Sequence, residues 1–496
     1  MLFNSIYFLL FFPIVVVIYY IIPQKLKNVW LLITSYYFYM SWNPKYVLLI
    51  MTSTVITYIS GLLIAKIREK KVTKELPLCK LVVAGSFAIN LGILFFFKYF
   101  LFSAGLFTRI VGLFGIQVNV PAFDIILPVG ISFYTFQALS YTMDVYRGEI
   151  YAEKNILKYA LFVSFFPQLV AGPIERSKNL LKQLSTQHKF NYENFTNGIL
   201  LMIWGYFLKM VIADRIAIFV DTVYGDYGTY GGMYIVVATM LFAIQIYCDF
   251  AGYSIIAMGA ASILGIKLME NFYAPYLSKS VGEFWRKWHV SLTSWFKDYL
   301  YIPLGGSRKG KIRKCINKLI VFFVSGLWHG ASLSFVFWGV LNGIYQIVEE
   351  LLKEPKNSLL NRIHINQNAI CYKVLSSIIT FILVDFSWLF FRANGLKESF
   401  AIIGSVVRNY NPWILVDGSL YQCGLDNKNF GLMIVSILIL LIADICKKRG
   451  VIIREIILRQ DYWARCLIIS VSIVFILIFG IYGAQYDASG FIYFQF

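Results

Sequence analysis

The segment Ile320-Val-Phe-Phe-Val-Ser-Gly-Leu-Trp-His-Gly-Ala331 combines an apolar character with a single titratable side chain. It lies inside the window 316–348, which is long enough to cross a bilayer, since a transmembrane helix needs roughly 20 apolar residues. A helix that is apolar around its whole circumference is surrounded by lipid or protein and not by water. An ionisable residue at membrane depth marks a functional site by default. The segment therefore predicts a membrane protein with His329 as a functional candidate.

The composition of the whole chain agrees with this prediction. Hydrophobic residues make up 59% of the 496 residues and charged residues only 14%, and the mean hydropathy is +0.67. A soluble domain carries about 25% charged residues. Apolar windows recur at 2–22, 29–42, 46–65, 81–103, 126–146, 156–172, 196–220, 232–262, 316–348, 373–391, 429–445 and 466–483. We predict an all-α polytopic membrane protein with about 11–13 transmembrane or re-entrant helices, and one membrane domain over residues 1–496.

The basic residues predict the topology. The net charge is +19, and lysines and arginines concentrate in three short loops, at 66–74, 307–314 and 447–449. Because positive loops stay in the cytoplasm, counting the apolar windows from these loops places both termini on the extracytoplasmic side. The first window has no basic n-region and ends at Pro23 without a small-residue cleavage site, so we expect it to remain as an anchor. Basic residues in separate loops do not form a nucleic-acid-binding face, and no nucleic-acid partner is expected.

The seven cysteines are scattered and lack metal-ligand spacing. None occurs in a CxxC or CxxxH pattern of the kind that zinc sites and redox motifs use. We therefore expect no metal site and no disulfide framework, and interpret most of these cysteines as small apolar residues.

A second histidine, His289, lies in a half-polar segment over 281–299. Apolar and aromatic residues recur there at helical spacing, with charged residues between them. A basic, tryptophan-rich amphipathic helix is typical of the membrane interface. We predict one interfacial helix on the cytoplasmic side, with His289 on the border of its polar face.

Small residues near His329 recur at four-residue intervals. Gly326 and Gly330 flank the histidine, and Gly339 and Gly343 repeat the spacing. This interval lets two helices approach closely, so we expect the glycines to have a packing role. His329, from its position alone, could act in chemistry or hydrogen-bond to a neighbouring helix.

Other polar side chains also lie inside apolar windows. Asp249 and Arg392 carry charge there, and Tyr134, Gln137 and Gln168 are uncharged. Such residues pair with neighbouring helices or line a pathway through the membrane. We favour structural pairing for Asp249 and Arg392.

Seven segments resemble, in order, the membrane-bound O-acyltransferase family, and within it the bacterial branch that includes the membrane subunit of alginate O-acetyltransferases. They are Leu127–Gln137, Phe166–Arg176, Tyr247–Tyr253, Asn271–Tyr276, Phe284–His289, Leu327–Ala331 and Phe390–Ala393. The resemblance covers nearly the whole chain, with N-terminal helices over 1–146, a catalytic core over 147–400, and C-terminal helices with an aromatic tail over 401–496. One position departs from the branch, which usually has a histidine where this chain has Asn342, so Asn342 is not expected to be the essential base.

This resemblance implies many helices around a central tunnel whose two funnels meet near His329, and transfer of an acyl group to a hydroxyl. His329 would act as general base or carry the acyl group as a nucleophile, and the sequence leaves both roles open. His289 would orient the thioester or support His329. No bound cofactor is implied, and cytosolic acetyl-CoA is the expected acyl donor. Its phosphates could be bound by Arg286, Lys287, Lys297 and Arg308, although membrane topology explains these four residues equally well.

The C-terminal segment Phe491-Ile-Tyr-Phe-Gln-Phe496 resembles an aromatic motif of the same branch. The resemblance implies that Tyr493 could relay the acyl group outward. An aromatic anchor at the membrane interface is the other interpretation of the motif. Both interpretations stay open.

We therefore expect a multi-pass O-acyltransferase of the bacterial plasma membrane that exports acetyl groups for O-acetylation of an extracytoplasmic polysaccharide. The chain contains no soluble hydrolase-like domain, so a separate extracytoplasmic transferase- or esterase-like partner is implied. D-alanyl transfer to teichoic acid from a carrier-protein thioester is the nearest alternative. A transporter or flippase without chemistry of its own is an alternative of another class. The sequence does not identify the polysaccharide.

Overall fold

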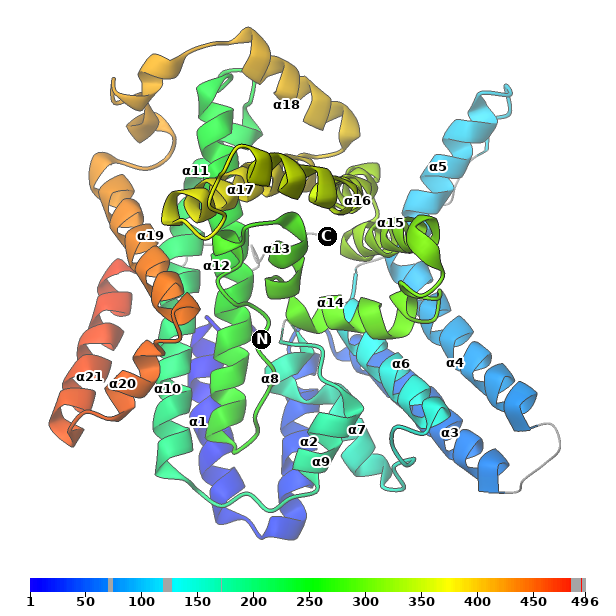
Figure 1. The fold of residues 1–496 in the computed structure, drawn as a ribbon. Coiled ribbons are helices and arrows are strands. Elements are labelled where there is room, and N and C mark those ends of the chain that lie inside the picture. The colour runs from blue at the N-terminus through cyan, green and yellow to red at the C-terminus, as the bar shows by residue number, and fades with distance from the viewer. Residues whose placement is uncertain (70–74, 119–126, 171, 483–491, 493–496) are drawn as a thin grey trace. The chain divides into compact units, whose positions relative to one another are not determined.

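The computed structural model describes residues 1–69, 75–118, 127–170, 172–482 and 492. Within these residues the backbone forms helices joined by loops and contains no β-strand (Figure 1). Seven of the described helices are long and apolar enough to cross a membrane, namely Pro44–Glu69, Leu76–Lys98, Met233–Ile263, Leu333–Arg362, Ile370–Arg392, Asn427–Lys448 and Tyr462–Phe479. The prediction of an all-α polytopic membrane protein is confirmed.

The chain forms two compact units, and each is described by itself. The first comprises Met1–Ile199 and Ala257–Met269, and the second comprises Leu200–Ile256 and Glu270–Phe496. Neither unit is therefore one continuous stretch of sequence.

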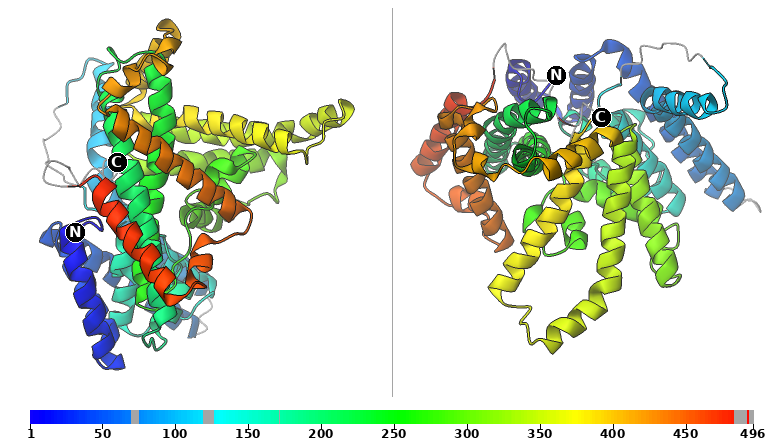
Figure 2. Two further views of the ribbon diagram at one scale, coloured as in Figure 1. Left: turned by 90° about the vertical axis from the view of Figure 1, so that its left-hand side faces the viewer. Right: turned by 90° about the horizontal axis from the view of Figure 1, so that it is seen from above.

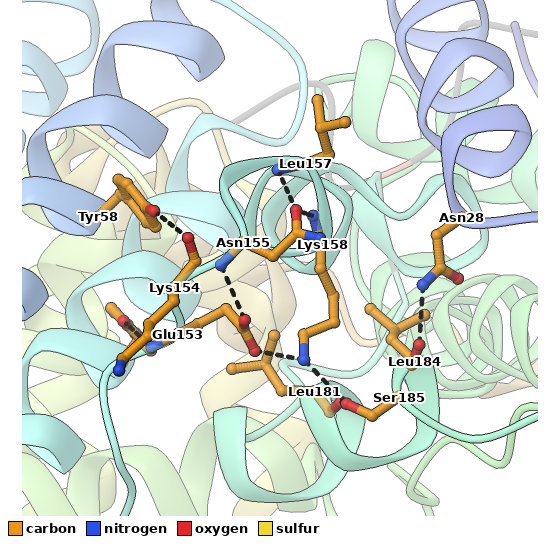
Figure 3. A network of polar contacts seen from close by, with 11 residues as sticks. Asn28, Tyr58, Glu153, Lys154, Asn155, Leu157, Lys158, Leu181, Leu184 and Ser185 are labelled. Atoms are coloured by element: carbon orange, nitrogen blue, oxygen red, sulfur yellow. Dashed lines mark hydrogen bonds and ion pairs between the residues drawn. The ribbon is translucent and has the colours of Figure 1, made fainter. Parts of the chain in front are cut away.

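The first unit is tied together at one end by a polar network. Its helices are α1 (Ile6–Ile21), α2 (Gln24–Met40), α3 (Val47–Glu69), α4 (Glu75–Lys98), α5 (Phe100–Gly112), α6 (Ile131–Arg147), α7 (Ile156–Ser164), α8 (Phe166–Leu169) and α9 (Ser177–Leu184). Asn155 caps α7, because its Oδ1 accepts a hydrogen bond from the backbone N–H of Lys158 at 3.2 Å. In Figure 3 the Lys158 ammonium lies between the Glu153 carboxylate and Ser185 Oγ, the latter at 2.9 Å. The Tyr58 hydroxyl of α3 donates to a carbonyl of the loop before α7 at 2.6 Å, so the network joins α3, α7 and the end of α9.

The second unit exposes apolar helix faces of the kind that contact lipid. Its helices are α11 (Asp214–Gly225), α13 (Val281–Lys287), α14 (Val290–Phe296), α15 (Gly310–His329), α16 (Leu333–Arg362), α17 (Ile370–Arg392), α18 (Leu396–Arg408), α19 (Asn427–Lys448), α20 (Ile453–Leu458) and α21 (Tyr462–Phe479), with parts of α10 (Tyr192–Tyr206) and α12 (Met233–Ile263). Large side chains remain exposed along α19 and α21, including Val435, Leu438, Ile442, Leu467, Val471 and Leu477. Exposed apolar surface on this scale is unfavourable in water and favourable in a bilayer.

The apolar window 316–348 contains two helices rather than one span. α15 ends at His329, and the backbone is extended at Gly330. Ser332 then starts α16, because its hydroxyl accepts a hydrogen bond from the N–H of Ser334 at 3.3 Å. The break leaves His329 at the point where α15 turns into α16.

α15 and α16 lie side by side (Figure 2). A Cβ added to Gly326 would overlap the carbonyl oxygen of Phe335, and a Cβ added to Gly339 would overlap the carbonyl oxygen of Phe322. Glycine therefore permits a backbone approach that any larger residue would prevent. The predicted packing role of these glycines is confirmed.

The predicted single interfacial helix over 281–299 is wrong. The structure has α13 and α14 there, separated by Trp288 in an extended conformation and by His289 in the left-handed region (φ 44°, ψ 55°). The cause lies in Asn271, whose backbone carbonyl and Oδ1 accept hydrogen bonds from the first two N–H groups of α14, at 2.9 and 3.2 Å. These bonds take the place of intrahelical ones. His289 is consequently buried, with 1% of its surface exposed, instead of lying on a solvated border.

Candidate active site

His329 is the last residue of α15 and is 5% exposed. Three aromatic rings surround its imidazole, with centroid separations of 5.0 Å to Trp328, 5.1 Å to Trp338 and 5.3 Å to Phe391. All three meet the imidazole nearly edge-on, at 83°, 87° and 72°. The enclosing residues come from α15, α16 and α17. Three packed helices thus fix the plane of the imidazole and restrict the access of water to it.

His289 lies in the turn between α13 and α14, where its backbone is strained. A left-handed conformation of a residue other than glycine costs on the order of 1–3 kcal/mol and occurs preferentially at functional sites. The ring of Phe250 packs edge-on against the imidazole, with centroids 4.6 Å apart. Burial lowers the pKa of His289 to about 3, so its imidazole is neutral at physiological pH.

One indole joins the two histidines. The ring of Trp328 lies 6.0 Å from His289 and 5.0 Å from His329, measured between centroids. Two segments about forty residues apart along the chain therefore meet in one cluster, which we call the histidine cluster: His289, Trp328 and His329. Both sequence-predicted histidines belong to it.

An aromatic wall supports the histidine cluster. Trp288 packs on Trp388 at 5.1 Å, and Trp388 stacks on Trp338 at 5.6 Å with an angle of 22° between the rings. The sequence interpretation missed Trp338 and Trp388 as neighbours of His329. For Trp338 a signal was present, because it lies four residues before Asn342 and therefore on the same face of α16.

Asn342 has a structural position beside this wall. Its Oδ1 accepts a hydrogen bond from the indole N–H of Trp285 at 3.2 Å, and its Nδ2 donates to the carbonyl of Trp338 at 2.9 Å. A buried amide that is bonded on both sides orients α13 against α16. Asn342 therefore has a role in helix packing, and this role does not require it to transfer a proton.

The four basic residues predicted to bind the donor lie on α13, directly after α14 and in the loop before α15. Arg286 and Lys287 form the end of α13, directly before the turn that holds His289. Lys287 is paired with Glu283 at 2.6 Å, and Arg286 is exposed. Lys297 follows α14, Arg308 lies in the loop before α15, and both are exposed.

The predicted intramembrane charges are paired. Asp249 on α12 lies 2.5 Å from Lys209, which the sequence interpretation did not single out although it is the one lysine within the apolar window 196–220. Arg392 at the end of α17 lies 2.6 Å from Asp221. Pairing is the expected state of ionisable groups at membrane depth.

The uncharged candidates belong to the first unit. In the first unit, Gln137 and Gln168 both donate to the carbonyl of Phe162, at 2.6 and 3.2 Å, and Tyr134 packs edge-on against a neighbouring tyrosine. These residues have packing partners within their own unit. Tyr493 lies outside the described residues.

Two substitutions at His289 should separate the role of its backbone from that of its imidazole. Asparagine tolerates the left-handed region, whereas alanine there costs roughly 1–2 kcal/mol. We expect His289→Asn to keep the thermal stability of the purified protein and His289→Ala to lower it. Both should reduce acyl transfer by at least about tenfold, because both remove the imidazole. Full activity of His289→Asn would show that only the turn is needed.

The comparison with protein families agrees with the position of this site. Residues 149–355 match the model described as MBOAT, membrane-bound O-acyltransferase family. The matched segment contains the whole histidine cluster and the four basic residues discussed above.

Individual relatives extend the similarity along the chain. The sequence is 34% identical to the probable alginate O-acetylase AlgI of Pseudomonas aeruginosa, over 88% of this chain and 80% of that protein. It is 32% identical to the peptidoglycan O-acetyltransferase of Helicobacter pylori, over 82% of this chain and 80% of that protein. The teichoic acid D-alanyltransferase of Bacillus subtilis is more distant, at 26% identity over 55% of this chain and 71% of that protein.

Proposed function

Because the chain belongs to the membrane-bound O-acyltransferase family and is therefore an O-acyltransferase, we propose that it transfers acetyl groups from cytosolic acetyl-CoA across the bacterial plasma membrane, for O-acetylation of an extracytoplasmic polysaccharide. Two relatives that are similar over about four-fifths of their length carry names of O-acetyl transfer, which supports acetyl as the group. Family membership argues against the alternative that the chain is a transporter or flippase that catalyses no reaction. The observation that carries the proposal is the meeting of two buried histidines at one indole.

His329 is the proposed general base. It takes the proton from the acceptor hydroxyl while the hydroxyl oxygen attacks the carbonyl carbon of the thioester. A C–O ester bond forms, the C–S bond breaks, and the leaving thiolate receives the proton as a thiol. In the alternative role the imidazole itself attacks the thioester and carries the acetyl group to the hydroxyl.

His289 is proposed to support this step without exchanging a proton. Its pKa of about 3 keeps the imidazole neutral, so it can donate or accept a hydrogen bond but is a weak base. The strained turn and the ring of Phe250 hold that imidazole in one orientation. A fixed neutral group of this kind can orient the thioester toward His329.

The donor is proposed to bind on the cytoplasmic side. Arg286 and Lys287 supply positive charge at the end of α13, Lys297 directly after α14, and Arg308 in the loop before α15. Acetyl-CoA carries phosphates that such residues bind by charge-assisted hydrogen bonds. By the positive-inside rule their loops face the cytoplasm, and both termini of the chain face outward.

Outward delivery is the remaining part of the proposal. Tyr493 is proposed to accept the acetyl group and relay it toward the extracytoplasmic side. A separate transferase- or esterase-like protein there completes the O-acetylation of the polysaccharide. The chain itself is proposed to supply the membrane-crossing step.

The donor is tested with membranes that contain the wild-type chain. One sample receives acetyl-CoA labelled in its acetyl carbons at the cytosolic face, and the other receives a D-alanyl carrier-protein thioester. We expect label from acetyl-CoA to reach protein and glycan, and no chain-dependent incorporation of D-alanine. Membranes from cells that lack the chain provide the control. Chain-dependent incorporation of D-alanine alone would replace the proposal with teichoic acid D-alanylation.

A further inference from the structure

Three charged side chains form a buried cluster in the second unit, and none of them belongs to the histidine cluster. Lys209 Nζ lies 2.8 Å from Asp214 Oδ1 and 2.5 Å from Asp249 Oδ1. All three side chains are at most 3% exposed. One ammonium group faces two carboxylates, so the cluster retains a negative charge. Because buried charge is costly unless its atoms are paired, a further hydrogen-bond donor is expected at one of the carboxylates.

Close helix packing holds this cluster in place. A Cβ added to Gly205 of α10 would lie 2.7 Å from the carbonyl oxygen of Gly252 on α12, and a Cβ added to Gly252 would lie 2.8 Å from that of Gly205. The two backbones are therefore in contact at this point. Lys209 follows within the π-helical segment Phe207–Ala213, and Asp249 lies one turn before Gly252. Single π-helical turns inside α-helices occur frequently at functional sites.

The further donor comes from the C-terminal end of the chain. The backbone N–H of Ile492 donates to Asp249 Oδ2 at 2.9 Å, and Ile492 is 4% exposed. The two oxygens of Asp249 thus have different partners, since Oδ1 bonds to Lys209. A backbone N–H that is removed from water needs such an acceptor.

The end of α21 and Ile481 after it also attach to the start of α11 and to the π-helical segment. The N–H of Ile481 donates to the carbonyl of Met210 at 2.9 Å, and the guanidinium of Arg215 donates to the carbonyl of Phe479 at 2.7 Å. Ile481 and Ile492 are therefore bound to the π-helical segment and to α12 of the same unit.

From these contacts we propose that Asp249, held by Lys209, is the docking point for the C-terminal segment, and that it is a positioning residue for acyl transfer. The carboxylate recognises the backbone of Ile492 and not its side chain. Lys209 neutralises part of the charge and fixes the second oxygen toward the segment. Asp214 shares Lys209 but does not bond to Ile492, so its role is to balance charge.

This inference rests on the proposed function in one respect, which is the reason that docking matters for catalysis. Tyr493, the residue proposed as the relay, directly follows Ile492 in the sequence, and for this reason the docking of Ile492 is expected to matter for acyl transfer. The docking itself requires no assumption about the acyl group.

Labelling of residue 492 tests the docking independently of any activity. Ile492→Cys keeps the backbone N–H, and it is introduced into a chain whose seven native cysteines are replaced by serine or alanine. The rate of maleimide modification is measured on the full-length protein in detergent. We expect Asp249→Ala to raise this rate at least tenfold, and Asp214→Ala to leave it within twofold. The two variants are matched, because each leaves one lysine facing one carboxylate.

Two outcomes would overturn the docking proposal. Equal labelling rates in the parent protein and in Asp249→Ala, with both monodisperse on size exclusion, would mean that Asp249 does not hold the segment. Equal increases in both alanine variants would mean that the cluster only stabilises the fold.

A second measurement tests positioning. Ile492→Pro removes the N–H, whereas Ile492→Ala keeps it, and neither changes the charge cluster. We expect Ile492→Pro and Asp249→Ala each to lower the turnover number for acetyl transfer at least tenfold with an unchanged KM for acetyl-CoA, and Ile492→Ala to lower it less than Ile492→Pro does. Normal turnover in Ile492→Pro would contradict positioning. If the wild-type chain transfers no acetyl group at all, the proposed function fails while the labelling result still decides the docking.

Discussion

Replacing His329 with alanine should lower acetyl transfer by about 10³-fold or more, because general base catalysis contributes typically 10²–10⁴-fold and an acyl carrier would be lost entirely. Three rings enclose the imidazole, and His329 is 5% exposed. Water therefore cannot readily replace it as the proton acceptor. His289 cannot replace it as a base at neutral pH, since burial lowers the pKa of His289 to about 3. The measurement is acetyl transfer from labelled acetyl-CoA in membranes with matched amounts of protein.

The chain supplies a control for this experiment. His364 is an exposed histidine in the loop between α16 and α17, and His364→Ala should transfer acetyl groups at the wild-type rate. The thermal stability of both variants is compared with that of the wild type. If His329→Ala keeps normal transfer while it folds normally, His329 is a structural residue and the catalytic assignment is wrong.

Adding one methyl group at Gly326 should also disable the enzyme, through the position of His329. The Cβ of Gly326→Ala would overlap the backbone carbonyl oxygen of Phe335, which cannot rotate away as a side chain can. α15 and α16 must therefore separate, and overpacking of this kind costs typically about 1–3 kcal/mol. His329 lies less than one turn further along α15, and a displacement of about 1 Å at a reacting group can cost about 10²-fold in rate. We expect lower thermal stability together with about 10²-fold slower transfer.

Gly343→Ala is the matched control at the same helix pair. There the added Cβ would lie 3.2 Å from Phe322 Cβ and 3.3 Å from a methyl group of Leu319, so a shift of a few tenths of an ångström relieves both contacts. We expect Gly343→Ala to retain transfer and to lose at most about 1 kcal/mol of stability. If the two alanine variants behave alike, the backbone contact at Gly326 does not position His329.

Features that depend on apolar length and spacing were predictable from the sequence. The all-α membrane fold follows from the hydrophobic windows, and the close pairing of α15 with α16 follows from glycines four residues apart. His329 was identified because an ionisable group within an apolar segment marks a functional site, whereas the role of His289 came from the resemblance to the acyltransferase family. Their identification needed no knowledge of the three-dimensional contacts.

Features that depend on long-range hydrogen bonds were not predictable. The pattern over 281–299 has helical periodicity, but two acceptors of Asn271 take the N–H groups that would have continued the helix. Local spacing contains no information about a residue nineteen or twenty positions earlier that accepts hydrogen bonds from these groups. Lys209 was missed for a related reason, since its partner Asp249 lies on another helix. Long-range pairs of this kind decided where the turn at His289 and the buried charges lie.

The pairing of Lys209 with Asp249 also has a consequence for the synthesis of the protein. A lone lysine or aspartate at the centre of a membrane helix costs about 2.5–3.5 kcal/mol when the translocon releases it into lipid. Lys209 follows α10 and can pair with Asp214 in its own segment, whereas Asp249 lies on α12, so α12 bears this cost until Asp249 and Lys209 meet. Release is most favourable when both segments leave the translocon together. Biogenesis should therefore retain α10 beside the channel until the ribosome has completed α12.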